Sequence, residues 1–148
     1  MSTSKIRTCL WFNDNGREAA EFYVSLVPGS EIESVDGVVT HFTLAGVPYM
    51  ALDGGDYYTL TPAASIMLHT EGQEENDRFY DALVADGGKP SMCGWLVDRF
   101  GLSWQVVPKE LFPLLGADDR DAAGRAREAM LKMQRLNIAQ LEAAFRGE

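Results

Sequence analysis

Thr8-Cys9-Leu10-Trp11-Phe12 is a short apolar run typical of a strand, and a helix-like run holding Phe22–Val27 follows it. Fifty-seven residues after Thr8, the chain repeats this pattern with Ser65-Ile66-Met67-Leu68-His69 and a second helix-like run holding Phe79–Val84. Each copy then closes with a glycine, a turn and another strand, at 46–52 and at 101–107. An internal repeat carries more information about a fold than any single residue does.

The repeat predicts an α+β protein made of two half-sheets that face each other across a pocket. We expect one domain over 4–112, with modules at 4–56 and 63–108, and a helical extension over 113–148. Hydrophobic periodicity predicts strands at 6–12, 31–35, 38–44, 48–52, 92–97 and 102–107, besides the strand that starts at Ser65. It predicts helices at 17–26, 74–85, 120–135 and 138–145.

Helix start signals accompany these predictions. The turn 13–16 offers caps for the first helix, Asp118 and Asp119 for the third, and Asn137 with Gln140 reads as a capping box. The apolar stripe of the C-terminal extension must pack on its own sheet or on a partner subunit, and packing on its own sheet is the simpler interpretation.

The composition excludes several classes of protein. The chain has 148 residues, 46% of them hydrophobic, and a formal net charge of −9. The negative charge argues against sequence-independent binding of nucleic acid. No apolar stretch approaches the roughly 20 residues that cross a bilayer, and the first five residues have no signal-peptide core. We therefore expect a cytoplasmic protein with no membrane or nucleic-acid partner, and with Cys9 and Cys93 as reduced, buried thiols.

Several motifs together resemble one known family. These are Phe22-Tyr23, Ala51-Leu52-Asp53-Gly54-Gly55, Cys93-Gly94-Trp95-Leu96-Val97-Asp98-Arg99-Phe100-Gly101 and Ser103-Trp104-Gln105-Val106-Val107-Pro108. They are similar to the PhnB-like branch of the glyoxalase, bleomycin resistance or vicinal oxygen chelate superfamily, whose members are often labelled demethylubiquinone methyltransferases. The resemblance implies two βαβββ modules in a cupped mixed sheet, and a homodimer. The sequence does not support the methyltransferase label, because neither first strand leads into a glycine-rich turn of the kind that cofactor sites in Rossmann-like sheets use.

The resemblance also implies where a divalent metal binds in related enzymes. Those positions correspond to Thr8, Met50, Ser65 and Gln105, with Thr8 and Ser65 as repeat mates. Of these, only Gln105 is a plausible ligand, because hydroxyls are weak donors and a thioether does not suit a hard cation. We therefore predict no metal at these positions and no cofactor.

The remaining candidates line the predicted pocket. By strand alternation, His69 shares a face with Ser65 and Met67, and with Thr8, Leu10 and Phe12 of the other copy. Leu10, Phe12, Met50 and Met67 are the expected walls, and Thr8, Ser65, His69 and Gln105 the expected polar contacts. His41, Cys93 and Trp104 complete the candidates. The simpler interpretations are a polar residue on the open face of a strand for His41, a hydrogen-bonded residue at a strand end for His69, a buried thiol for Cys93 and a core residue for Trp104.

Two functional hypotheses follow. The first is a protein that binds a small organic molecule between its modules without the usual metal. The alternative is a metal-assisted isomerase, lyase or dioxygenase-type enzyme of the superfamily. A structural or interaction-only role stays open, and is favoured if side chains fill the cavity.

Overall fold

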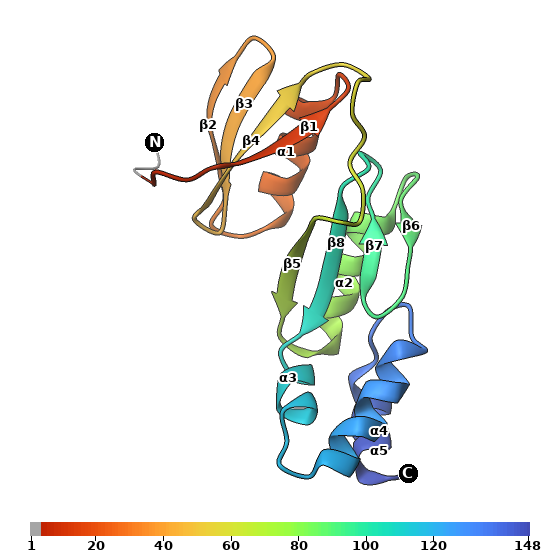
Figure 1. Ribbon diagram of the computed structural model, residues 1–148. Coiled ribbons are helices and arrows are strands. Elements are labelled where there is room, and N and C mark those ends of the chain that lie inside the picture. Colours follow the sequence, from red (N-terminus) through yellow and green to blue (C-terminus); the bar gives the residue numbers. More distant parts are fainter. Residues whose placement is uncertain (1–3) are drawn as a thin grey trace. The chain divides into compact units, whose positions relative to one another are not determined.

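The computed structural model describes residues 4–148, and the chain divides into two compact units, up to Thr61 and from Pro62 onward. Each unit is described by itself below (Figure 1). The predicted absence of a signal peptide concerns residues 1–3 in part, and these lie outside the described residues. Within 4–148, no helix is long and apolar enough to span a membrane.

The first unit is a four-stranded mixed sheet with one helix. Its elements are β1 (Thr8–Phe12), α1 (Gly16–Leu26), β2 (Glu31–Asp36), β3 (Val39–Leu44) and β4 (Val47–Asp53). The strand order is β1-β4-β3-β2, with β1 parallel to β4 and the other pairs antiparallel. This is the predicted βαβββ module.

The second unit repeats that plan and adds helices. Its module consists of β5 (Ser65–Thr70), α2 (Gly72–Val84), β6 (Lys89–Pro90), β7 (Trp95–Val97) and β8 (Ser103–Pro108), in the order β5-β8-β7-β6. Again the first and last strands are parallel. The helices α3 (Leu111–Leu115), α4 (Arg120–Leu131) and α5 (Ile138–Arg146) follow. The predicted α+β class, the two modules and the C-terminal helices are confirmed.

The helix of each module covers one face of its own sheet. In the first unit, Leu10, Phe42 and Ala51 point to the same side by strand register, and all three are buried. The ring of Tyr23 on α1 lies 6.5 Å from that of Phe42. In the second unit, Leu96, Trp104 and Val106 are fully buried on the helix side. Within residues 4–148, the other face of each sheet carries no helix of its own module.

A carboxylate at the end of the last strand of each module, or just after it, holds the start of the module helix. Asp53 Oδ1, at the end of β4, accepts a 2.7 Å hydrogen bond from Gly16 N of α1. Glu110 Oε2, just after β8, accepts one of 2.9 Å from Gly72 N of α2. A negative charge here satisfies a free amide and complements the helix dipole. The local cap predicted at 13–16 is wrong, because Asn15 makes no side-chain cap hydrogen bond.

The C-terminal helices pack on their own unit. Val107, Leu111, Leu136 and Leu141 form a buried cluster. Gln73 on α2 fastens the segment before α5: its amide donates to Leu136 O at 3.0 Å and accepts from Ile138 N at 2.7 Å. The predicted side-chain caps are confirmed, since Asp119 accepts from Ala122 N and Asn137 from Gln140 N.

Four elements of the second unit differ from the predictions. Neither α3 nor β6 is predicted from the sequence, and the helix predicted at 120–135 ends at Leu131. The strand predicted at 92–97 begins only at Trp95, because Cys93 and Gly94 have φ of 62° and 87° and turn the chain. At Gly94 a side chain is excluded, since a Cβ would lie 2.8 Å from Val106 O.

Candidate functional site

The outer face of the first sheet carries three sulfur- or nitrogen-bearing side chains in one row. Met50 on β4 lies directly opposite Cys9 on β1 and opposite His41 on β3. Directly opposed residues project to the same face, with Cβ atoms about 5 Å apart. The core residues Leu10 and Ala51 alternate with this row, so the row faces away from α1.

These three side chains are only partly engaged by the protein. Cys9 is exposed, and partial burial raises the pKa of its thiol above the ordinary value of 9.0. Met50 and His41 are half-buried. The Nδ1 atom of His41 is buried, and residues 4–148 offer it no hydrogen-bond partner. Buried polar atoms normally have a partner, so this imidazole has an unused bonding position.

An ion pair and an aromatic pair border the row. Arg7 Nη2 donates to Glu33 Oε1 at 2.8 Å, and the Glu33 side chain is 1% exposed. Two residues beyond Cys9, Trp11 Nε1 donates to Gly55 O at 2.9 Å, and its ring meets Tyr58 edge-on at 5.0 Å. The row therefore has a neutralised charge pair on one side and an aromatic cluster on the other.

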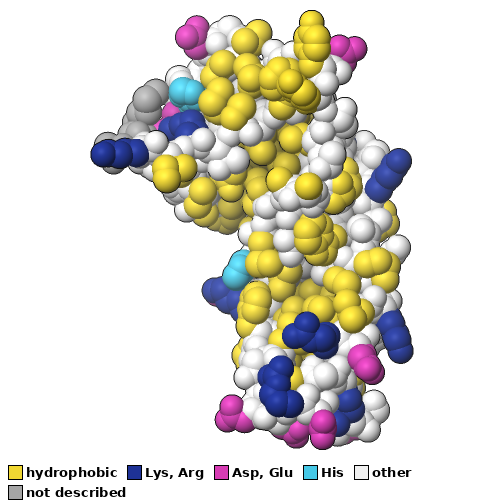
Figure 2. Space-filling model, in the orientation of Figure 1, with side chains coloured by type: hydrophobic (Ala, Val, Ile, Leu, Met, Phe, Trp, Pro, Cys, Tyr) yellow, Lys and Arg dark blue, Asp and Glu magenta, His cyan; other side chains and the backbone are white. Residues whose placement is uncertain are grey.

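The outer face of the second sheet combines a polar pair with apolar neighbours. Gln105 Nε2 on β8 donates to Ser65 Oγ on β5 at 2.9 Å. Gln105 lies opposite Met67 on one side and Trp95 on the other, and Met67 is 43% exposed. Figure 2 shows hydrophobic side chains gathered over the strands of each unit.

The candidate His69 lies at the end of this face. Its ring stacks on that of Phe112 from α3, with centroids 5.3 Å apart and planes inclined by 24°. As predicted, Ser65, Met67 and His69 project to one face of the sheet, because the register of β5 against β8 is regular.

Other candidates lie away from these faces. Leu10 and Phe12 are 6% and 2% exposed and pack on the helix side of the first sheet. The prediction that they line one pocket wall together with Met50 is therefore wrong. Trp104 is fully buried on the helix side of the second sheet. Cys93 lies in the turn before β7, half-buried, and Cys9 is exposed, so the expectation of two buried thiols is wrong for Cys9.

The strand register shows that the predicted pairing of repeat mates is wrong by one residue. Aligning the two glycine turns makes Trp104 the counterpart of Tyr49. Thr8 lies opposite Tyr49, and Ile66 lies opposite Trp104. The structural mate of Thr8 is therefore Ile66 and not Ser65. A shift of one residue moves a side chain to the opposite face of a strand, so Thr8 and Met50 project from opposite faces of the first sheet.

The four family metal positions do not fit a divalent ion. The side chains of Thr8 and Met50 project to opposite faces of the first sheet. The hydroxyls of Thr8 and Ser65 and the thioether of Met50 are also poor donors for a hard cation, which leaves the Gln105 amide oxygen as the single plausible ligand. Within residues 4–148, no group of three or more His, Cys, Asp and Glu side chains is placed to hold a metal.

The motif that carries the resemblance forms a hydrogen-bonded hairpin. Asp98, between β7 and β8, is 3% exposed. Its Oδ1 accepts from Phe100 N at 2.8 Å and from Leu102 N at 3.0 Å, and its Oδ2 accepts from Trp104 Nε1 at 2.9 Å. Asp98 and Trp104 therefore set the register that presents Gln105 on the outer face.

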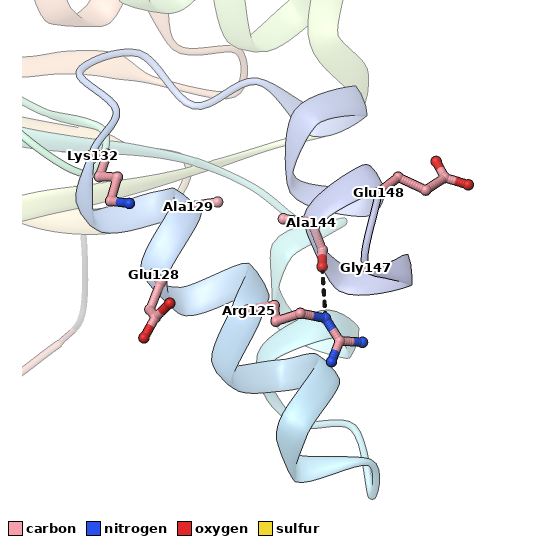
Figure 3. Close-up of a pocket in the computed structure, with 7 residues that line it drawn as sticks. All are labelled: Arg125, Glu128, Ala129, Lys132, Ala144, Gly147 and Glu148. Atoms are coloured by element: carbon pink, nitrogen blue, oxygen red, sulfur yellow. Dashed lines mark hydrogen bonds between the residues drawn. The ribbon is translucent and has the colours of Figure 1, made fainter.

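One pocket of about 370 Å³ lies in the C-terminal extension, between α4 and α5 (Figure 3). Arg125, one of its lining residues, donates to Ala144 O at 3.1 Å and to Phe145 O at 2.7 Å. Its lining residues are Arg125, Glu128, Ala129, Lys132, Ala144, Gly147 and Glu148. The guanidinium thus satisfies backbone carbonyls at the C-terminal end of α5, which is a structural role.

Comparison with known proteins identifies relatives of both modules. A family model described as 3-demethylubiquinone-9 3-methyltransferase matches residues 4–107. A solved PhnB protein from Bacillus cereus is 32% identical; the match covers 71% of this chain and 99% of that one, with a TM-score of 0.65. A protein from Pseudomonas aeruginosa is 26% identical over 72% of this chain and 98% of its own, with a TM-score of 0.58.

A glyoxalase/bleomycin resistance protein from Albidiferax ferrireducens shares the fold. It is 17% identical over 66% of this chain and 92% of its own, with a TM-score of 0.50. No match is found among curated proteins. The helices α3, α4 and α5 lie beyond the residues that the family model matches.

Proposed function

Since the chain belongs to the 3-demethylubiquinone-9 3-methyltransferase family, in the PhnB-like branch of the glyoxalase and bleomycin resistance superfamily, we propose that it binds a small organic molecule on the outer face of its second sheet. Ligand sites are mostly apolar with a few placed polar groups. The observation that carries the proposal is the hydrogen bond from Gln105 to Ser65, on a face where Gln105 lies between Met67 and Trp95.

The polar pair is suited to orient a ligand by hydrogen bonding. The Gln105 amide spends one N–H on Ser65, which leaves its carbonyl oxygen and its second N–H. Met67 offers a flexible apolar surface. This face is therefore suited to bind a neutral, partly apolar molecule that bears a carbonyl or a hydroxyl group.

Methyl transfer, the activity in the family's name, is not part of this proposal. The connections that follow β1 and β5 are Asn13-Asp14-Asn15 and Glu71, and neither is the glycine-rich turn of a Rossmann-like cofactor site. The four family metal positions do not fit a hard cation either.

The test is a binding titration with an organic probe. Titration with the neutral ketone 6-propionyl-2-(dimethylamino)naphthalene measures fluorescence enhancement in the wild type, in Gln105→Leu and in the control Gln140→Leu, whose side chain lies on α5. Loss of one or two neutral hydrogen bonds weakens binding by about 1 to 2 kcal/mol, roughly five- to thirtyfold. Equal affinity in all three proteins, with unchanged circular dichroism, would refute the proposed face.

We further propose a cytoplasmic homodimer, as the family resemblance implies. Sedimentation equilibrium at micromolar concentration is expected to give twice the chain mass of 16.3 kDa. A single species at the chain mass would contradict the dimer without touching the ligand proposal, because the Gln105–Ser65 pair lies within one chain.

A further inference from the structure

We propose that Phe112 on α3 makes the outer face of the second sheet selective for planar aromatic ligands, a specificity that rests on the proposed binding of the ligand at Gln105. Phe112 lies outside residues 4–107, which the family model matches. The C-terminal extension therefore contributes a residue of its own to the site, and this residue decides which class of ligand the face accepts.

The outer face of the second sheet continues onto α3. Met67 and His69 are two residues apart on β5 and project to the same face. The ring of His69 stacks on that of Phe112, with centroids 5.3 Å apart and planes inclined by 24°. Figure 1 shows α3 directly beyond the C-terminal ends of β5 and β8. The surface thus runs from Met67 over His69 to an aromatic ring on the next element.

This aromatic ring is held firmly and is still open to a ligand. Phe112 N donates to Lys109 O at 3.2 Å, and Phe112 O accepts from Gly116 N at 2.9 Å. The preceding Leu111 is 4% exposed and anchors α3 in the buried cluster. The Phe112 side chain nevertheless stays 42% exposed. A side chain that is already fixed before binding loses little entropy when a ligand stacks on it.

The spacing along the strands sets the size of the ligand. Gln105 lies opposite Met67, and His69 lies two residues farther along β5. Two residues of a strand span roughly 6.6 Å and neighbouring strands lie about 4.8 Å apart, so Gln105 and His69 are about 8 Å apart. A ligand whose carbonyl accepts from the Gln105 amide therefore reaches the aromatic pair with a group about as long as two fused rings.

The groups between these two ends favour a flat ring. Met67 lies beside Gln105 and is 43% exposed, and a thioether makes favourable contacts with aromatic rings. Aromatic rings also attract each other beyond the effect of the area that they bury, which corresponds to about two- to tenfold in affinity. A saturated ring of the same size gains the burial but not this additional attraction.

The charged residues just before α3 are engaged, which favours a neutral ligand. Lys109 Nζ donates to Glu71 Oε1 at 2.7 Å. Glu110 Oε2 accepts from Gly72 N at 2.9 Å. The expected ligand is thus a neutral, planar aromatic molecule with a carbonyl group.

The test compares two ketones that differ only in the flatness of their rings. The flat 2-acetylnaphthalene and the saturated 2-acetyldecahydronaphthalene each displace 6-propionyl-2-(dimethylamino)naphthalene from the full-length protein, as read by its fluorescence. We expect the wild type to bind the flat ketone about two- to tenfold more tightly. Phe112→Leu should lose this preference. The control Phe145→Leu should keep it, because Phe145 lies at the C-terminal end of α5, which points away from the strands of its unit (Figure 1).

Equal affinity of the wild type for the two ketones would overturn the aromatic specificity, and so would a preference that Phe112→Leu retains. Should Phe112→Leu fail to fold, His69→Ala removes the exposed ring that holds Phe112 and is expected to reduce the same preference; an unchanged preference there would also overturn it. The proposed function fails in a different way. If Gln105→Leu changes neither affinity while Phe112→Leu abolishes the preference, binding at Gln105 is refuted and the aromatic specificity of Phe112 is supported.

Discussion

Replacing Asp98 by asparagine is expected to destabilise the second unit by about 3 kcal/mol. The 3% exposed carboxylate accepts hydrogen bonds from two backbone amides and from Trp104 Nε1. The asparagine oxygen can keep the two amide bonds, but its NH₂ group would then face the indole N–H. A buried hydrogen bond to a charged acceptor is worth about 1.5 to 3 kcal/mol, and a donor left without an acceptor costs a similar amount.

A double-mutant cycle isolates the contribution of Trp104. Trp104→Phe removes the indole donor, so Asp98→Asn in that background should cost only about 1 kcal/mol, which gives a coupling energy of about 2 kcal/mol. Urea unfolding followed by far-ultraviolet circular dichroism measures each corner of the cycle. The control is Asp86→Asn, because the Asp86 side chain is 76% exposed and a change there is worth less than about 0.5 kcal/mol.

Equal destabilisation by Asp98→Asn in both backgrounds would refute this reasoning. It would mean that the Asp98–Trp104 hydrogen bond contributes nothing beyond the turn itself. In that case, the motif would not owe its register to this carboxylate.

Further predictions concern a close contact and a buried hydroxyl. Gly54→Ala should lower the free energy of unfolding by about 1 to 3 kcal/mol, because a Cβ would lie 2.3 Å from the Trp11 indole. Gly124→Ala in α4 should raise the free energy of unfolding by about 0.5 to 1 kcal/mol, because its Cβ would meet nothing within 4 Å. A change of the same sign in both variants would contradict the packing. Tyr80→Phe should leave stability equal or raise it by up to about 1 kcal/mol, since the buried hydroxyl has no hydrogen-bond partner among residues 4–148; a marked loss in urea unfolding would show that a water satisfies it. Burial raises the pKa of Tyr80 above its ordinary value of 10.0, more than the Arg135 guanidinium lowers it. The folded state therefore holds this proton longer than the unfolded state, so wild-type stability should fall as the pH rises above 10 and fall less in Tyr80→Phe; parallel pH profiles would contradict this.

Sequence patterns could predict the modules because they act over short distances. Apolar periodicity, glycine turns and capping residues such as Asp119 and Asn137 are local, and the structure confirms those two caps. The repeat doubled the evidence for each element. The short α3 was missed because five residues are too few for helical periodicity to show.

The missed features depend on contacts between distant residues. Asp53 holds Gly16 at the start of α1, and Glu110 holds Gly72 at the start of α2. These pairs are 37 and 38 residues apart in the chain. No local sequence pattern links a carboxylate near the last strand of a module to the first amide of the module's helix. Only the folded structure therefore shows which residue provides the cap.

The sequence by itself determined the family, the two βαβββ modules and the poor donor set at the family's metal positions, because these follow from residue types and local periodicity. Only the tertiary structure decided which side chains share a face. The pairing of β1 with β4 and of β5 with β8 makes Ile66 the mate of Thr8, and it places Cys9, not Leu10, beside Met50. Alternation has a period of two, so an offset of one residue exchanges core and surface along a whole strand. That offset is set by hydrogen bonds between strands about 40 residues apart.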